Sequence, residues 1–311
     1  MVAVASRPSR LQVILAFAAV YIIWGSTYLA IRFAIETLPP FLMAGARFLV
    51  AGGALYLWSR ARGAERPQPV HWRSAAIVGG CLLLGGNGLV VWAEQRVPSG
   101  LAALLVATTP LWMVLFDGLR RGERPSAWVL GGIAIGLVGV ALLVGPGDVT
   151  GLVSGRGADP VGALALLGAS LSWATGSIYS RSAPLPAVPA LGTAMEMLCG
   201  GVFLLILGLA VGQGSRLDPG AVSTRSLLAL VYLIAFGSLV GFTAYIWLLG
   251  VAPPAIVSTY AFVNPVVAVL LGWALAGEQV TSRTLLAMAL IVAAVIAITA
   301  YRATGAVKRR S

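Results

Sequence analysis

Long apolar stretches alternate with short polar segments along almost the whole chain. A helix needs about 20 apolar residues to cross a bilayer, and ten stretches come close to or exceed that length. Their approximate bounds are 11–32, 39–59, 72–93, 98–118, 126–145, 160–181, 187–211, 225–249, 253–275 and 281–302. Because the connections between them are short, the pattern predicts an all-α polytopic membrane protein with ten transmembrane helices.

Two of these stretches share one pattern of Pro, Gly and Glu residues. Residues 98–126 align with residues 253–281 without a gap. The alignment and its backward extension pair Pro98 with Pro253, Pro110 with Pro265, Glu123 with Glu278, Trp92 with Trp247, and Gly86 with Gly241. We interpret the chain as an internal duplication, and we expect the two acids to cap or tie helix ends.

The longest connection, residues 146–159, is rich in Gly and polar residues and divides the chain into halves of five spans. The halves are residues 11–145 and 160–302, and residues 303–311 form a basic tail. Because five is odd, the second half enters the membrane from the opposite side, which gives a 5+5 inverted-topology repeat. Such repeats are typical of alternating-access transporters, although some channels share them.

Composition supports the membrane assignment. The 311 residues are 59% hydrophobic and 10% charged, with a mean hydropathy of +0.93, which excludes an ordinary soluble domain. The net charge of +11 comes from Lys and Arg clustered between apolar runs. We attribute it to membrane loops and to contact with membrane lipid, and we expect no nucleic-acid partner.

The basic residues also predict the orientation. With the N-terminus in the cytoplasm, 14 Lys and Arg residues lie on the inner side and six on the outer side. The outer six are Arg32, Arg96, Arg156, Arg216, Arg225 and Arg283. The positive-inside rule therefore predicts that both termini and the tail 303–311 are cytoplasmic, and that the linker 146–159 is extracytoplasmic.

The side chains needed for catalysis or metal binding are scarce. The single histidine, His71, lies in a basic loop, and Cys81 and Cys199 lie within apolar runs. No His and Cys cluster has metal-ligand spacing, no catalytic triad can be assembled, and no Walker motif is present. We therefore expect neither an enzyme nor a bound metal or cofactor.

Glycines at four-residue spacing let helices approach closely in lipid. The pairs with this spacing are Gly132 and Gly136, Gly208 and Gly212, and Gly237 and Gly241. We expect them to serve helix packing. A homodimer face on the fifth and tenth spans is a further possibility, so both a monomer and a homodimer are open.

Several motifs in fixed order resemble one family. They are WGSTYLAIR from Trp24, AGARFLVAGG from Ala44, WATGSIYSR from Trp173, the prolines Pro110 and Pro265, and the Gly-Glu that follows each proline. Together they resemble the EamA-type branch of the drug/metabolite transporter superfamily. The resemblance implies a carrier of the bacterial inner (plasma) membrane. Spans one to four and six to nine would surround a central cavity, and similar members export amino acids and related metabolites.

Two charged residues lie well inside predicted spans, Arg47 in the second and Glu196 in the seventh. Charges in the membrane are costly and suggest function. In one interpretation they face the same cavity and bind the carboxylate and amine of a zwitterionic substrate, or Glu196 carries a coupled proton. In the other, Arg47 ties backbone carbonyls and Glu196 pairs with a hydroxyl or reaches the membrane surface.

Aromatic, hydroxyl and amide residues near the middle of the spans form the second candidate set for substrate binding. Its members are Trp24, Thr27, Tyr28, Asn87, Thr108, Thr109, Trp112, Trp173, Ser177, Tyr245, Tyr260 and Asn264. An apolar pocket with a few fixed polar groups suits a small amphipathic ligand, and ring faces attract an ammonium group. Ordinary helix packing is the alternative for each residue. Trp58, Trp72 and Trp128, near span ends, instead fit the interfacial belt.

Pro110 and Pro265 lie in the fourth and ninth spans, where each removes a backbone donor and predicts a kink. A kink frees carbonyls one turn earlier, and Thr109 and Asn264, directly before the prolines, are placed to satisfy them. Each proline is either a hinge or a static bend.

These patterns together predict an exporter of small amphipathic metabolites, with aromatic and other neutral amino acids first, working by alternating access. One alternative is a carrier of xenobiotic cations or another metabolite. A second is a membrane sensor or assembly subunit that does not transport, although no soluble output domain is evident.

Overall fold

The computed structural model describes residues 9–120, 122, 127–144, 159–251 and 260–308. Its α-helices are α1 (Arg10–Ala34), α2 (Pro40–Ala61), α3 (Pro69–Gly79), α4 (Leu89–Ala93), α5 (Ser99–Val106), α6 (Thr109–Arg120), α7 (Ala127–Val144), α9 (Pro160–Ser180), α10 (Pro189–Ala210), α11 (Thr224–Tyr232), α12 (Gly241–Val251), α14 (Tyr260–Ala276) and α15 (Ser282–Lys308). Two π-helical segments, η1 (Gly80–Gly88) and η4 (Leu233–Val240), continue α3 and α11, and η2 (Gly214–Arg216) and η3 (Pro219–Ala221) are short 3-10 turns. The described residues contain no β-strand.

Among the described residues, seven helical spans are long and apolar enough to cross a membrane. They are Arg10–Ala34, Pro40–Ala61, Pro69–Ala93, Ser99–Arg120, Pro160–Ser180, Pro189–Ala210 and Thr224–Tyr245. Shorter apolar helical segments cover Leu130–Gly139, Val263–Ala276 and Ser282–Ala294. The prediction of an all-α polytopic membrane protein is confirmed. The number of ten spans and the inverted repeat stay predictions, and most of the linker 146–159 lies outside the described residues.

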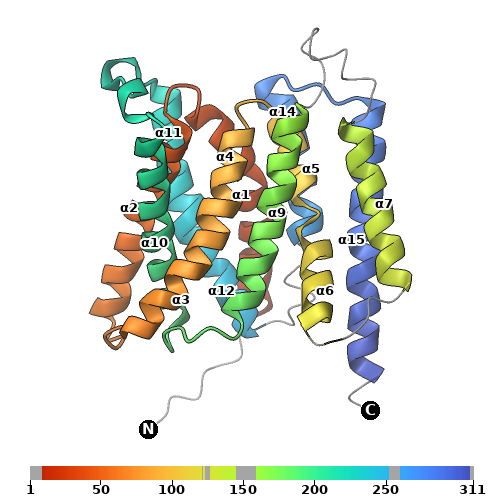
Figure 1. The fold of residues 1–311 in the computed structure, drawn as a ribbon, viewed down its shortest axis with the longest axis horizontal. Coiled ribbons are helices and arrows are strands. Elements are labelled where there is room, and N and C mark those ends of the chain that lie inside the picture. Colours follow the sequence, from red (N-terminus) through yellow and green to blue (C-terminus); the bar gives the residue numbers. More distant parts are fainter. Residues whose placement is uncertain (1–8, 121, 123–126, 145–158, 252–259, 309–311) are drawn as a thin grey trace.

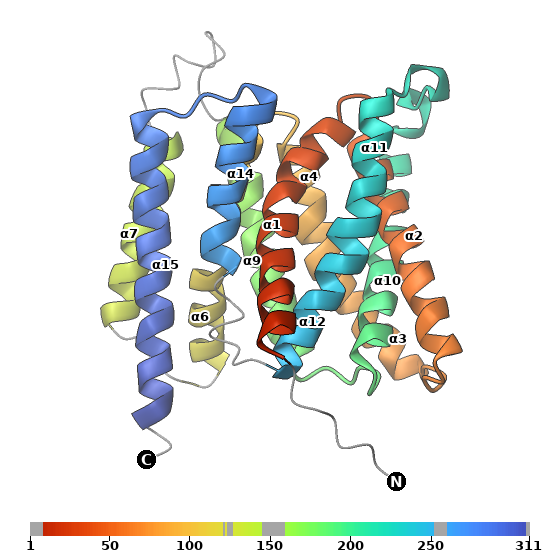
Figure 2. The same ribbon diagram turned by 180° about the vertical axis from the view of Figure 1, so that it is seen from behind.

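The helices run side by side as one bundle, with α1 beginning and α15 ending at the same end of it (Figures 1 and 2). We call this end the terminal face and the other end the opposite face. Helices α7 and α15 pack together at one edge, where Gly139 lies against Ile291. Helices α2 and α10 pack closely at the other edge, where Gly52 lies against Met197.

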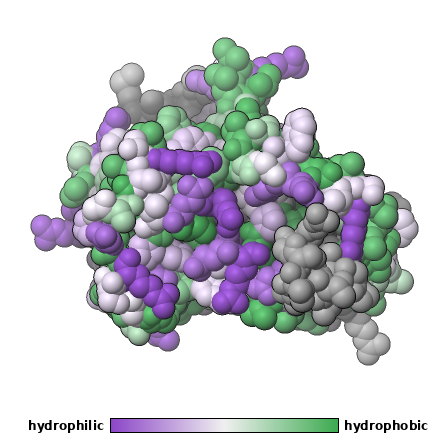
Figure 3. All heavy atoms as spheres, turned by 90° about the horizontal axis from the view of Figure 1, so that it is seen from above, coloured by the Kyte–Doolittle hydropathy of each residue, from purple (hydrophilic) through white to green (hydrophobic). Residues whose placement is uncertain are grey.

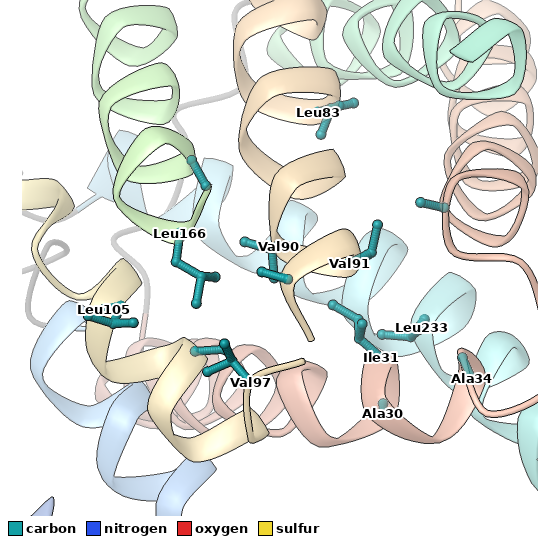
Figure 4. Close-up of a cluster of buried hydrophobic side chains, with 14 of the residues drawn as sticks. Ala30, Ile31, Ala34, Leu83, Val90, Val91, Val97, Leu105, Leu166 and Leu233 are labelled. Atoms are coloured by element: carbon teal, nitrogen blue, oxygen red, sulfur yellow. The ribbon is translucent and has the colours of Figure 1, made fainter. Parts of the chain in front are cut away.

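The buried core joins helices from distant parts of the sequence. Its fully buried side chains include Phe48 of α2, Leu104 of α5, Leu166 of α9 and Leu233 of η4. Figure 4 shows Ile31, Val90, Val91, Val97 and others of this cluster around the end of α4. Large apolar side chains on the outer helix surfaces are exposed, and polar residues gather on the opposite face with apolar residues around its rim (Figure 3). This distribution suits a bundle surrounded by lipid.

The glycine pairs do not all serve helix packing. Gly208 of α10 packs against Phe41 and Leu42 of α2, as expected. Its partner Gly212 follows the end of α10 at a positive φ of 76°, so it ends the helix instead of packing within it. The prediction was wrong for Gly212 because a spacing of four residues cannot tell a packing glycine from a helix terminator.

The two prolines differ in their surroundings. Pro265 lies inside α14, where a kink was expected. Pro110 is instead the second residue of α6, because helix α5 ends at Val106, before the proline. The chain is therefore interrupted, and not simply bent, at the predicted kink of the fourth span.

Candidate functional site

Four aromatic side chains from α1, α12 and α14 form a cluster. The ring centroid of Trp24 lies 5.3 Å from that of Phe242, 5.0 Å from that of Tyr245 and 5.2 Å from that of Tyr260. Tyr245 and Tyr260 also meet edge to face, with their centroids 5.8 Å apart. We call these four residues the aromatic cluster. It brings together three members of the predicted substrate-binding set, Trp24, Tyr245 and Tyr260.

The π-helical segment η4 fixes the position of Trp24. The backbone N–H of Gly241 donates to the carbonyl of Phe236, and the Gly237 carbonyl accepts a hydrogen bond of 3.2 Å from the Trp24 indole. A Cβ atom at Gly241 would lie only 2.5 Å from the Trp24 Nε1. A wide helical turn and a glycine together make room for the indole ring.

A similar contact between a tryptophan and a glycine occurs a second time in the molecule. Trp173 of α9 lies against Gly86 of the other π-helical segment, η1, and a Cβ atom at Gly86 would lie 2.9 Å from its ring. Gly86 and Gly241 are paired by the alignment of the two halves, and Trp24 and Trp173 begin related motifs. Each tryptophan therefore packs against a glycine, and the alignment of the two halves pairs these two glycines.

Arg47 of α2 reaches the same part of η4. Its side chain is 4% exposed, and its Nε donates to the Ser238 Oγ at 2.9 Å. A Cβ atom at Gly237 would lie 3.2 Å from the Arg47 Nη2 and 3.1 Å from the Thr27 Cγ2. We call Trp24, Thr27 and Arg47, together with Gly237 and Ser238, the η4 junction. It combines a buried cation with the tryptophan that also belongs to the aromatic cluster.

Glu94 is a buried acid that the sequence analysis missed. It directly follows α4, is 0% exposed, and interacts electrostatically with Arg32, Arg47 and Glu278. Neither of its carboxylate oxygens has a hydrogen-bond partner in the described part of the chain. In the sequence, Glu94 comes two residues after Trp92, at the border of an apolar run. At such a border the sequence does not show whether an acid is buried or lies in an exposed loop.

Glu196 does not meet Arg47. It lies on α10, where its backbone carbonyl packs against Gly79 of α3. Within the residues that the structure describes, its side chain has no hydrogen bond or ion pair, whereas Arg47 is engaged with Ser238 and interacts with Glu94. Of the two predicted intramembrane charges, only Arg47 belongs to the η4 junction.

Three of the predicted hydroxyl residues donate to backbone carbonyls three residues earlier in the chain. Thr27 donates to the Trp24 carbonyl at 2.6 Å, Thr108 to that of Leu105 at 2.7 Å, and Thr109 to that of Val106 at 2.7 Å. Thr109 therefore satisfies a carbonyl at the interruption before Pro110, as its position predicts.

The remaining predicted residues are dispersed. Tyr28 packs against the main core and interacts electrostatically with Glu94. Asn264 is buried in α14, and its carbonyl lies near Gly25. The Trp112 indole N–H is buried with no partner among the described residues. Asn87 in η1 and Ser177 in α9 are half-buried.

A cleft of about 450 Å³ lies between α6 and α9, outside the predicted site. Its lining residues are Phe116, Arg120, Thr175, Ile178, Tyr179 and Ser182. The described residues contain no group of three His, Cys, Asp or Glu side chains that could hold a metal ion.

Comparisons with known proteins agree with the architecture. The chain is 44% identical over 283 residues to the uncharacterized inner membrane transporter YedA of Escherichia coli strain K12, which covers 90% of this chain and 88% of YedA. It is 28% identical to the uncharacterized transporter YvbV of Bacillus subtilis strain 168, over 92% of this chain and 90% of YvbV. A protein of known crystal structure has a similar fold, with a TM-score of 0.63 and 23% identity; the match covers 94% of this chain and 99% of that protein's chain.

The model of the EamA-like transporter family matches residues 11–145 and 160–300. Members of this family are transporters and not enzymes, and the relatives and the apolar helices place the chain in the inner membrane as a multi-pass protein. The chain belongs to the EamA-like transporter family, within the drug/metabolite transporter superfamily.

Proposed function

We propose that this transporter exports small amphipathic metabolites, amino acids first, through a site at the η4 junction. The observation that carries the proposal is the convergence of Trp24, Thr27 and Arg47 on Gly237 and Ser238. A guanidinium binds a carboxylate, and the neighbouring ring faces attract an ammonium group. An amino acid carries both groups on one carbon, so it matches this pair of features.

The junction also suits alternating access. Trp24 and Arg47 come from the predicted first half, whereas η4 and the other rings of the aromatic cluster come from the predicted second half. The equivalent contacts of Trp24 with Gly241 and Trp173 with Gly86 support an inverted repeat. We propose that the halves rock against each other around this site, so that access alternates between the two faces.

The proposed direction is export, with both termini in the cytoplasm. The excess of basic residues on the predicted inner side supports this orientation. The start of α1 and the end of α15 lie at one face, as both termini on one side require (Figure 2). The opposite face would then be extracytoplasmic.

A second candidate function is the export of organic cations. The aromatic cluster favours it, because several ring faces close to one another stabilise a desolvated cation without a carboxylate partner. The two candidates differ in their need for Arg47, which would repel a cation that lacks a carboxylate.

The test is transport by the purified protein in liposomes. Radiolabelled amino acids and organic cations are offered one at a time to vesicles preloaded with the same unlabelled compound. We expect labelled aromatic or other neutral amino acids to enter faster than in protein-free vesicles. Entry of cations alone would favour the second candidate, and entry of no amino acid would overturn the first.

A further inference from the structure

One fully buried acid in the described structure, Glu94, has no hydrogen bond to its carboxylate. Glu94 is 0% exposed, and its backbone is well satisfied: its N–H bonds to the end of α4, and its carbonyl accepts from the Arg32 Nη1 at 2.7 Å. Both carboxylate oxygens, by contrast, lack a hydrogen-bond partner within the described residues. A carboxylate that is charged and unsatisfied costs several kcal/mol in such a place.

Several residues close to Glu94 in the sequence are buried and apolar. Val90, Val91 and Val97, which flank it in the chain, are buried and point into the cluster that contains Ile31 and Leu233 (Figure 4). The segment that carries Glu94 therefore follows α4 at a place where side chains of α1, α4 and η4 pack together.

The charged and titratable groups around Glu94 come from three neighbouring elements. They are Tyr28 and Arg32 of α1, Arg47 of α2, and Glu278, which follows α14. Arg32 donates to the backbone carbonyl of Glu94 and Arg47 donates to Ser238, and no hydrogen bond joins either guanidinium to the Glu94 carboxylate in the described chain. Neither forms an ion pair within 4.0 Å of the Glu94 carboxylate in the described chain, and Glu278 adds a like charge.

We propose that Glu94 is a proton-binding residue, neutral in the conformation described here, whose loss of the proton couples substrate export to a proton gradient. A proton needs no cavity of its own. One O–H bond of hydronium breaks, a new O–H bond forms on a carboxylate oxygen of Glu94, and a water molecule is released. When the helices around α4 separate as access changes, water solvates the carboxylate, and the proton returns to water. The coupling rests on the proposed transport function, whereas the protonation itself does not.

Infrared spectroscopy tests the protonation without any substrate. At neutral pH we expect the spectrum of the wild type minus that of Glu94→Gln to contain the C=O band of a protonated carboxyl group. Glu278→Gln is the control, because Glu278 accepts three hydrogen bonds as a carboxylate, and its difference spectrum should lack that band. Carboxylate bands in the Glu94 difference spectrum would overturn the proposal.

Liposome transport tests the coupling. Glu94→Gln imitates the protonated side chain, so we expect exchange of labelled for unlabelled amino acid within about twofold of the wild type, and no accumulation driven by a pH gradient. Glu94→Asp keeps an acid and should retain accumulation, which guards against a folding defect of the first variant. Gradient-driven accumulation by Glu94→Gln at the wild-type level would overturn the coupling. A wild type that moves no amino acid in either mode would instead overturn the proposed function, with the infrared result unaffected.

Discussion

The indole ring of Trp24 lies directly against Gly241, where any larger residue would displace it. A Cβ atom at Gly241 would lie 2.5 Å from the Trp24 Nε1 and 2.9 Å from its Cδ1. This contact holds the aromatic cluster to the end of η4, because the same indole donates to the Gly237 carbonyl. The position of the proposed substrate site therefore depends on Gly241, because only glycine leaves room for the indole ring.

Gly241→Ala should consequently destabilise the protein and slow transport. Overpacking of this kind costs about 1–3 kcal/mol, and a displaced indole would lose its hydrogen bond to Gly237. The measurement is thermal unfolding in detergent, together with flux in liposomes. Gly53→Ala in α2 is the control, because a Cβ atom there meets nothing within 4 Å and alanine favours the helix by up to about 1 kcal/mol. Equal losses in both variants would contradict the packing argument.

Glu278 caps α5 from the far end of the sequence. Its Oε1 accepts from the Ser99 N–H and Oγ, both at 2.7 Å, and its Oε2 accepts from the Gly100 N–H at 3.0 Å. This confirms that Glu278 ties a helix end, whereas its repeat partner Glu123 lies outside the described residues. We expect Glu278→Gln to lower the free energy of unfolding by about 1–3 kcal/mol, because an amide cannot accept all three bonds.

Glu36→Gln is the matched control for Glu278. Glu36 forms an ion pair of 3.4 Å with Arg225, and both side chains are substantially exposed. Exposed pairs contribute about 0–1 kcal/mol, so this variant should unfold close to the wild type. If the two variants lost the same stability, the cap of α5 would not be the cause.

Arg47 and Ser238 should be energetically coupled. Ser238→Ala removes the acceptor of a buried charged donor and should cost about 1–3 kcal/mol. Arg47→Lys keeps the charge but not the Nε–H, so it breaks the same bond. A double-mutant cycle measured by denaturant unfolding should show that the second change adds little to the first. Full additivity would mean that the bond contributes nothing.

The two prolines should respond differently to replacement by alanine. Pro265→Ala restores a backbone donor inside α14, which should straighten and stabilise that helix and, if the bend is a hinge, slow transport by on the order of tenfold. Pro110→Ala should change little, because the second residue of α6 needs no intrahelical donor. Flux in liposomes and thermal unfolding, measured on both variants, test this difference. An unchanged flux in Pro265→Ala would show a static bend.

The sequence predicted the fold class well because apolar length is a local property. Trp24, a residue of the predicted substrate-binding set, lies in the aromatic cluster, and Trp58 and Trp128 are exposed, but the roles expected of these three residues stay predictions. It could not pair Arg47 with Ser238, since that contact joins residues 191 positions apart. One interpretation placed Arg47 and Glu196 at the same cavity because both charges lie inside apolar runs, whereas Arg47 bonds to Ser238 of η4.

The burial of Glu94 could not be predicted from the sequence either. Hydropathy places the end of the third span only to within a few residues, and a single turn separates a loop acid from a buried one. The π-helical segments are another case, because the wide turns in η1 and η4 have no simple apolar period. Glu94 and the two π-helical segments therefore became evident only from the three-dimensional structure.

The most direct test of the account is the rate of amino-acid exchange by Trp24→Ala in liposomes. Loss of the indole removes the centre of the aromatic cluster, so the rate should fall by about tenfold, which corresponds to ~1.4 kcal/mol. Trp58→Ala, at a tryptophan that is half exposed on α2, should stay within about twofold of the wild type. Exchange by Trp24→Ala at the wild-type rate would contradict a substrate site at the η4 junction.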